Sequence, residues 1–209
     1  MKKILGLTIA MVAILATVVI GTLAYFSDTE TSADNVFTAG TLDLKVSNDA
    51  STYTDGVTAT FNNTSLKPGD TVSGTVTLKN DGTIAANHVE MKFTYVNTEA
   101  TTPAEILGAA SEVLDMATVL EITTATYGGV DIIDDLKTLI GGSPTKIYLS
   151  DLSGLTFSTT DVPTPSGAAT KALALTFTID SAVGNGIQGD TITLTITFGL
   201  FQDASQHLP

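Results

Sequence analysis

The sequence predicts an all-β fold, a two-sheet antiparallel jelly-roll-like sandwich with one helical insertion. Apolar and polar residues alternate with period two over several short segments, and turn-forming residues separate those segments. The chain of 209 residues is also rich in Thr, with 37 of them, and β-branched residues favour strands over helices. Two packed antiparallel sheets satisfy this pattern, although the sequence does not give the strand order.

The predicted strands place apolar side chains on one face and mostly Thr on the other, so each sheet has one buried and one solvated side. They cover residues 42–46, 57–61, 72–78, 89–95, 173–179 and 192–200.

Turn chemistry separates the strands. Pro68 and Gly69 set a turn before the strand at 72–78, and Gly184 and Gly189 precede the last strand. Asn80-Asp81-Gly82-Thr83 predicts a hairpin-like connection between the strands on either side of it.

The alternation breaks between about residues 102 and 155. Thr102-Pro103-Ala104-Glu105 is typical of a helix start, and apolar residues then follow at helical spacing up to residue 114. A strand over 119–126 and a second helix over 131–140, stopped by two glycines, complete the region. We expect this insertion to pack over one sheet edge.

The first 24 residues predict an export leader. Lys2 and Lys3 precede 20 residues without a charge, and small residues lead up to Ala24. We expect cleavage between Ala24 and Tyr25, which would leave residues 25–36 as an N-terminal segment and 37–209 as the sandwich domain. The apolar run is also long enough to span a bilayer, so a retained membrane anchor is the alternative.

Composition excludes several functional classes. Nine basic and 22 acidic side chains give a net charge of −13, which opposes binding to a nucleic-acid backbone. The chain contains no Cys, so it has no disulfide, Cys-ligated metal or Cys nucleophile. Its stability must therefore come from packing rather than from cross-links.

No catalytic motif is apparent in the sequence. A zinc peptidase needs two His one helical turn apart with a Glu between them, whereas His88 and His207 lie at distant positions. We expect His88 and Glu90 to share the outer, solvated face of a strand, and His207 to lie in the C-terminal tail. The sequence therefore predicts no catalytic residue, no metal ligand and no cofactor.

Two weaker signals remain open. Asp131, Asp134 and Asp135 could supply the oxygen ligands that calcium prefers, but they lack the spacing of an EF-hand loop, and we favour a solvated helix N-terminal face as their explanation. Asn62 and Asn63 begin overlapping glycosylation acceptors, which matter only in a host that glycosylates Asn.

The segment that follows the predicted cleavage point begins with two aromatic residues and continues as a polar run without Gly or Pro. Its residues are Tyr25, Phe26, Ser27, Asp28, Thr29, Glu30, Thr31, Ser32, Ala33, Asp34 and Asn35. A chain end of this kind is usually disordered unless something ties it down.

Seven short motifs are distributed over both ends of the chain. They are Gly21-Thr22-Leu23-Ala24-Tyr25-Phe26-Ser27-Asp28, Phe37-Thr38-Ala39-Gly40-Thr41-Leu42-Asp43-Leu44, Leu66-Lys67-Pro68-Gly69-Asp70, Lys79-Asn80-Asp81-Gly82, 89–95, Gln188-Gly189-Asp190 and 192–201. In their order and spacing, these motifs together resemble the TasA/camelysin family of exported biofilm-matrix fibre proteins, and also archaeal bundling-pilus subunits. The resemblance covers roughly the first 95 and last 20 residues, and the middle does not match.

The resemblance implies a secreted jelly-roll subunit that polymerises with itself by donor-strand exchange after a dedicated signal peptidase removes the leader. Residues 25–35 would leave their own subunit and add a strand to the next one, where Tyr25 and Phe26 could fill an apolar groove. Contact with a membrane would then be limited to export, and the product would be an extracellular filament. Otherwise the segment is a loose leader or folds back on its own sheet.

Three other functions remain as alternatives. Camelysin-type relatives imply a cell-surface metallopeptidase, which the lack of a His pair opposes. A type IV pilin would carry a Glu just inside its hydrophobic helix, and residues 4–23 contain no acidic residue. The last alternative is a monomeric adhesion module held to the membrane by an uncleaved leader.

Overall fold

The computed structural model describes residues 39–56, 66–100, 114–187 and 189–209, and Ala39–Pro209 form one compact unit. The predicted leader, cleavage point and donor segment lie outside the described residues, as do the predicted strand at 57–61, the glycosylation acceptors and most of the first predicted helix.

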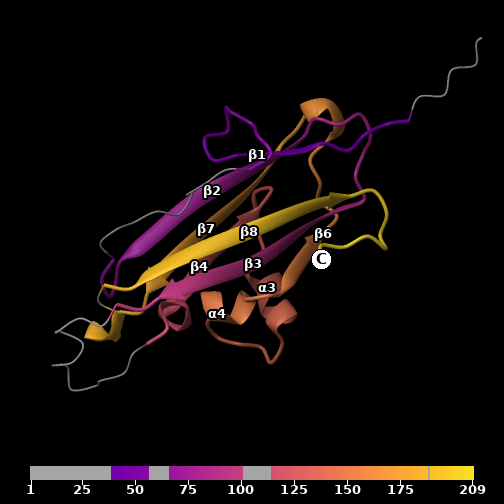
Figure 1. Ribbon diagram of the computed structural model, residues 1–209. Coiled ribbons are helices and arrows are strands. Elements are labelled where there is room, and N and C mark those ends of the chain that lie inside the picture. The colour runs from indigo at the N-terminus through magenta and orange to yellow at the C-terminus, as the bar shows by residue number, and fades with distance from the viewer. Residues whose placement is uncertain (1–38, 57–65, 101–113, 188) are drawn as a thin grey trace, which may run out of the picture. The chain divides into compact units, whose positions relative to one another are not determined.

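Two antiparallel sheets form the body of the molecule, which confirms the predicted sandwich (Figure 1). The five-stranded sheet has the order β1-β2-β7-β4-β5, and the three-stranded sheet has the order β6-β3-β8. The strands are β1 Leu44–Ser47, β2 Thr71–Asn80, β3 His88–Thr98, β4 Leu120–Tyr127, β5 Val130–Asp131, β6 Thr156–Thr159, β7 Lys171–Ile179 and β8 Thr191–Phe201.

The helices are short. Of the helices in the described ranges, none is both long and apolar enough to cross a membrane. They are η1 Met116–Thr118, α3 Ile133–Ile140, α4 Leu149–Leu152, η2 Pro165–Gly167 and η3 Asn185–Ile187.

Alternation along the strands fills the core between the sheets. On β7 every second side chain is at most 2% exposed, because this strand lies in the middle of its sheet and is covered by the other one. These side chains are Leu173, Leu175, Phe177 and Ile179. On the opposite face the Ser73 and Thr176 hydroxyls lie 3.0 Å apart across β2 and β7. Ser73 is exposed and Thr176 is partly exposed, so the Thr-rich face is solvated as predicted.

The predicted insertion is more closely integrated than expected. Its strand, β4, pairs with β7 along its whole length and is an interior strand, rather than part of a unit packed over a sheet edge. Gly128 and Gly129 connect β4 to β5 with φ of 58° and 85°, as a two-residue hairpin turn with two positive φ angles requires. α3 follows where the second helix was predicted and ends before Gly141.

The predicted hairpin at Asn80–Thr83 is wrong, because β2 and β3 belong to different sheets. The segment instead crosses between the sheets around Asn80, whose side chain is fully buried. Asn80 Oδ1 accepts a hydrogen bond from the Gly82 N–H at 2.9 Å, and Nδ2 donates to the Ile84 carbonyl at 3.0 Å. Gly82 is required there because a Cβ would clash with the Thr41 carbonyl oxygen. Asn80-Asp81-Gly82 therefore forms a connection that crosses from one sheet to the other.

Candidate functional site

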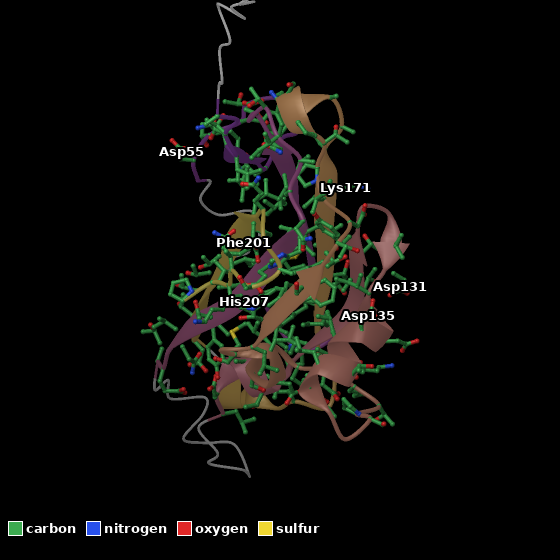
Figure 2. The ribbon with its side chains drawn as sticks, turned by 90° about the vertical axis from the view of Figure 1, so that its right-hand side faces the viewer. Asp55, Asp131, Asp135, Lys171, Phe201 and His207 are labelled. Atoms are coloured by element: carbon green, nitrogen blue, oxygen red, sulfur yellow. The ribbon has the colours of Figure 1, made fainter. Side chains whose placement is uncertain are left out.

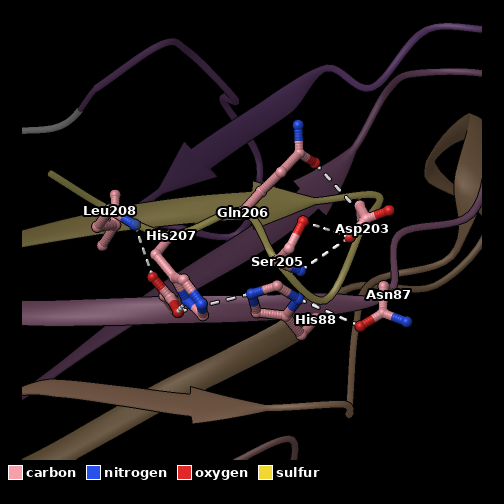
Figure 3. Close-up of polar contacts among 8 residues, drawn as sticks. Asn87, His88, Asp203, Ser205, Gln206, His207 and Leu208 are labelled. Carbon is pink, nitrogen blue, oxygen red and sulfur yellow. Dashed lines mark hydrogen bonds and ion pairs between the residues drawn. The ribbon is translucent and has the colours of Figure 1, made fainter.

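The C-terminal tail turns back over the outer face of the three-stranded sheet. Asp203 organises this turn: its Oδ1 accepts hydrogen bonds from the Ser205 N–H at 2.8 Å and the Ser205 hydroxyl at 2.7 Å. The same bonds hold the pKa of Asp203 below its usual value. Gln206 Oε1 accepts from the Asp203 N–H at 3.2 Å, which closes the turn. The reversal after β8 thereby brings residues 207–209 against β3 (Figure 3).

Glu90 is the anchor for this tail, and it is only 2% exposed. Its Oε1 lies 2.6 Å from His207 Nδ1, and its Oε2 accepts a hydrogen bond from the Leu208 N–H at 2.7 Å. Burial raises the pKa of Glu90, but the hydrogen bonds from His207 and Leu208, together with the electrostatic influence of His207 and His88, leave the pKa below its ordinary value. Glu90 is therefore a buried, charged carboxylate at neutral pH.

His88 lies beside Glu90 at the start of β3 and is 5% exposed. Its ring stacks on Phe201 with centroids 5.1 Å apart. Nδ1 lies 3.2 Å from the Asn87 side-chain oxygen, an acceptor, so Nδ1 carries the proton in this arrangement. Nε2 lies 3.5 Å from Glu90 Oε1 and has no hydrogen-bond partner among the described residues.

His88, Glu90 and His207 therefore form one group of metal-ligating side chains, here called the tail cluster. One ligand atom from each residue lies within 4.8 Å of the other two. The prediction that His88 is solvated is wrong, because the tail and the Phe201 ring cover it. Separation along the chain also misled the prediction, since β8 and the turn bring His207 back to β3.

The three candidate calcium ligands do not converge. Asp131 Oδ1 accepts from the Ile133 N–H at 2.8 Å, and Asp134 pairs with Lys137 at 3.4 Å. Figure 2 shows Asp131 and Asp135 at the molecular surface, well away from His207. Within the described ranges, the tail cluster is the group of His and acidic residues that could hold a metal ion.

A second candidate site is the outer edge of β8. All 11 residues of β8 pair with β3 on one side, and no strand of the described part of the chain pairs with β8 on the other. Its inward-facing side chains contact the core yet stay only partly buried, unlike those of β7. They are Ile192, Leu194, Ile196, Phe198 and Leu200.

Comparison with known proteins gives two matches. A family model described as camelysin metallo-endopeptidase matches residues 1–122. The chain is also similar to a protein of Bacillus subtilis (strain 168) named "Major biofilm matrix component", with 33% identity over 152 residues. The match covers 72% of this chain and 50% of that relative, so the chain spans about half the length of the curated relative it matches.

The name of the matched family model implies a metal ion, and the tail cluster fits one. It offers two imidazole nitrogens and a carboxylate, which is a donor set that zinc accepts. The buried Nε2 of His88 without a partner is the feature of this structure that such an ion would satisfy.

Proposed function

Since the chain belongs to the TasA/camelysin family, we propose that it is a secreted structural subunit of an extracellular biofilm-matrix or cell-surface fibre. Subunits join head to tail by donor-strand exchange, and no nucleic acid takes part. The observation that carries the proposal is the long β8 edge, which has a partly buried apolar face and no partner strand among the described residues.

Export prepares the donor. In this proposal a dedicated signal peptidase cuts between Ala24 and Tyr25, and the membrane is contacted only until that cut. Residues 25–35 then form a freed N-terminal segment of a mature chain. Before the cut, the leader would keep the segment from reaching a neighbouring subunit, so cleavage switches assembly on.

The β8 edge suits a foreign strand on two grounds. An edge strand presents N–H and C=O groups that another extended chain can pair with, and β8 offers this along 11 residues. Burying the partly exposed apolar side chains would stabilise the added strand by about 25 cal/mol for each Å² of apolar surface that is removed from water. An added strand beside β8 would also widen the three-stranded sheet so that it covers more of the five-stranded one.

The donor segment matches this edge in length and pattern. It has the same number of residues as β8, from Tyr25 to Asn35. In an extended conformation one face would carry Tyr25 with only neutral side chains, and the other would carry Phe26 with every acidic residue of the segment. The neutral face can therefore turn toward the apolar side of the sandwich while the acids stay in solvent.

Donation from each subunit to the next is a heterologous contact, and contacts of this kind build open filaments when they do not close into rings. The product is a homopolymer whose interface consists of one strand and one edge.

Engineered cross-linking tests the proposal cleanly because the natural chain contains no Cys. A Thr195→Cys substitution places a thiol on the exposed face of β8, and a panel with Cys at 28, 30 or 32 places the partner thiol on the face of the donor that this proposal leaves in solvent. We expect oxidised filaments of at least one pair to run as a ladder of covalent multimers under denaturing conditions. The matched control is Thr176→Cys, because β7 is paired on both sides.

Deletion of residues 25–35 gives the second arm. The truncated protein should stay folded and monomeric and should form no filaments by negative-stain microscopy. Filaments that persist after the deletion would refute strand donation by this segment. Multimers that form equally with Cys at 176 would refute β8 as the acceptor.

We further propose that the chain is not an enzyme. The matched relative is named as a matrix component, and the sequence lacks the helical His pair of zinc peptidases. Chelator-sensitive casein cleavage that is lost in His88→Ala would establish a peptidase instead.

A further inference from the structure

We propose that the tail cluster binds one divalent ion of the zinc class, which fastens the C-terminal tail to β3. The ligands are His88 Nε2, a Glu90 carboxylate oxygen and His207 Nδ1. Two of them come from the sandwich and the third comes from the tail, so the ion would cross-link segments that are 117 residues apart along the chain. This proposal is independent of strand donation.

His88 provides the strongest observation. Its Nδ1 lies 3.2 Å from the Asn87 side-chain oxygen, and its buried Nε2 lies 3.5 Å from Glu90 Oε1 without a hydrogen-bond partner among the described residues. A positive charge between a ring nitrogen and a carboxylate oxygen that face each other in this way stabilises both. A bound metal ion supplies that charge, and the Asn87 contact is the kind of outer-shell bond that fixes the tautomer of a metal-binding His.

The distances require only a small adjustment. Ligand atoms 2.0–2.1 Å from a tetrahedral zinc ion lie about 3.3 Å from one another. His88 Nε2 and Glu90 Oε1 already match this separation, while the His207–Glu90 contact of 2.6 Å is a hydrogen bond that would open. His207 can move because its side chain is 64% exposed, whereas the other two ligands are held in the sheet.

The donor set selects the class of metal. Two imidazoles and one carboxylate suit zinc and its transition-metal neighbours, whereas calcium and magnesium prefer sites made only of oxygen. These are the only two His residues of a chain without Cys, so a zinc site that uses nitrogen from two side chains must use both. The net charge of −13 raises the local cation concentration around the site.

Isothermal titration calorimetry of the purified protein, stripped of metal with a chelator and then dialysed, tests the assignment with Zn²⁺ alone. We expect one binding site that persists in millimolar Ca²⁺. His88→Ala, Glu90→Gln and His207→Ala should each weaken binding at least about 100-fold, because loss of an outer-shell contact alone costs about 10–100-fold. Asn87→Ala should weaken binding about tenfold.

Glu121→Gln is the matched control, since it removes the same charge from a partly buried carboxylate that pairs with Lys146 on the other sheet. It should leave Zn²⁺ affinity unchanged. Circular dichroism would show whether each variant keeps the sandwich fold. If Glu90→Gln does not fold, the two His variants still decide the matter, since His207 lies on the exposed tail.

Hydrogen exchange gives a readout that does not depend on affinity. Zn²⁺ should slow exchange across residues 202–209, including the Leu208 amide that donates to Glu90. The proposal is overturned if Zn²⁺ does not bind, if millimolar Ca²⁺ displaces it, if the His variants bind as tightly as the natural chain, or if the tail exchanges equally fast with and without the ion.

Discussion

Asn80 allows a stability prediction that can be worked out from contacts. Replacing it by Ala removes the acceptor of the buried Gly82 N–H and the donor to the Ile84 carbonyl. A third contact, from the Asp43 N–H at 3.4 Å, is too long to add much. Each backbone group left without a partner in a buried site costs about 1–3 kcal/mol.

We therefore expect Asn80→Ala to lower the free energy of unfolding by about 3 kcal/mol. For a protein of this size that loss lowers Tm by about 6–12 °C. Denaturant titration followed by circular dichroism measures the first value, and a thermal scan measures the second.

Asp81→Asn is the control on the same crossing. It removes a surface ion pair with Lys79 at 2.7 Å, and such pairs contribute about 0–1 kcal/mol. If Asn80→Ala costs less than about 1 kcal/mol, or no more than the control, then the Asn80 hydrogen bonds do not hold the crossing together and the reasoning is wrong.

Three further predictions concern stability. Tyr127→Phe should leave Tm unchanged or raise it, because the buried Tyr127 hydroxyl has no hydrogen-bond partner among the described residues; a loss above about 1 kcal/mol would contradict this. Hydrogen bonding from the Ala182 N–H and then Lys146 lowers the pKa of Asp180, so this stabilisation is present at neutral pH and is lost as the pH falls below about 4. Lys146→Met should therefore reduce the drop in Tm between pH 7 and pH 3, and an unchanged drop would count against the pairing. Leu136→Ala, on the buried face of α3, should cost about 2–5 kcal/mol in denaturant unfolding, and a cost below 1 kcal/mol would show that α3 is not part of the core.

The strands were predictable because their signal is local. Residues 173–179 and 192–200 alternate so regularly that the strands and their inward-facing sides follow from period two. The family resemblance is also confirmed, since it depended on short motifs at both ends of the chain. The crossing at Asn80 could not be told from a hairpin, because both use the same turn residues.

The tail cluster could not be predicted for the opposite reason. Alternation correctly placed His88 and Glu90 on the outer face of β3, but their burial depends on a segment that joins them only after β8 has paired. The sequence contains no spacing that marks His207 as their neighbour. A site whose residues are brought together only by the tertiary structure cannot be predicted from local sequence patterns.

Strand order has a consequence for how the chain folds. β7 is the centre of one sheet and β8 is the main partner of β3 in the other, so neither layer can be completed until the last fifth of the chain has been synthesised. Such late, long-range pairing gives a high contact order and slow folding. A nascent polypeptide halted before residue 171 would lack the central strand of one layer and the longest partner of β3 in the other, and pulse proteolysis of stalled chains should find it open to digestion.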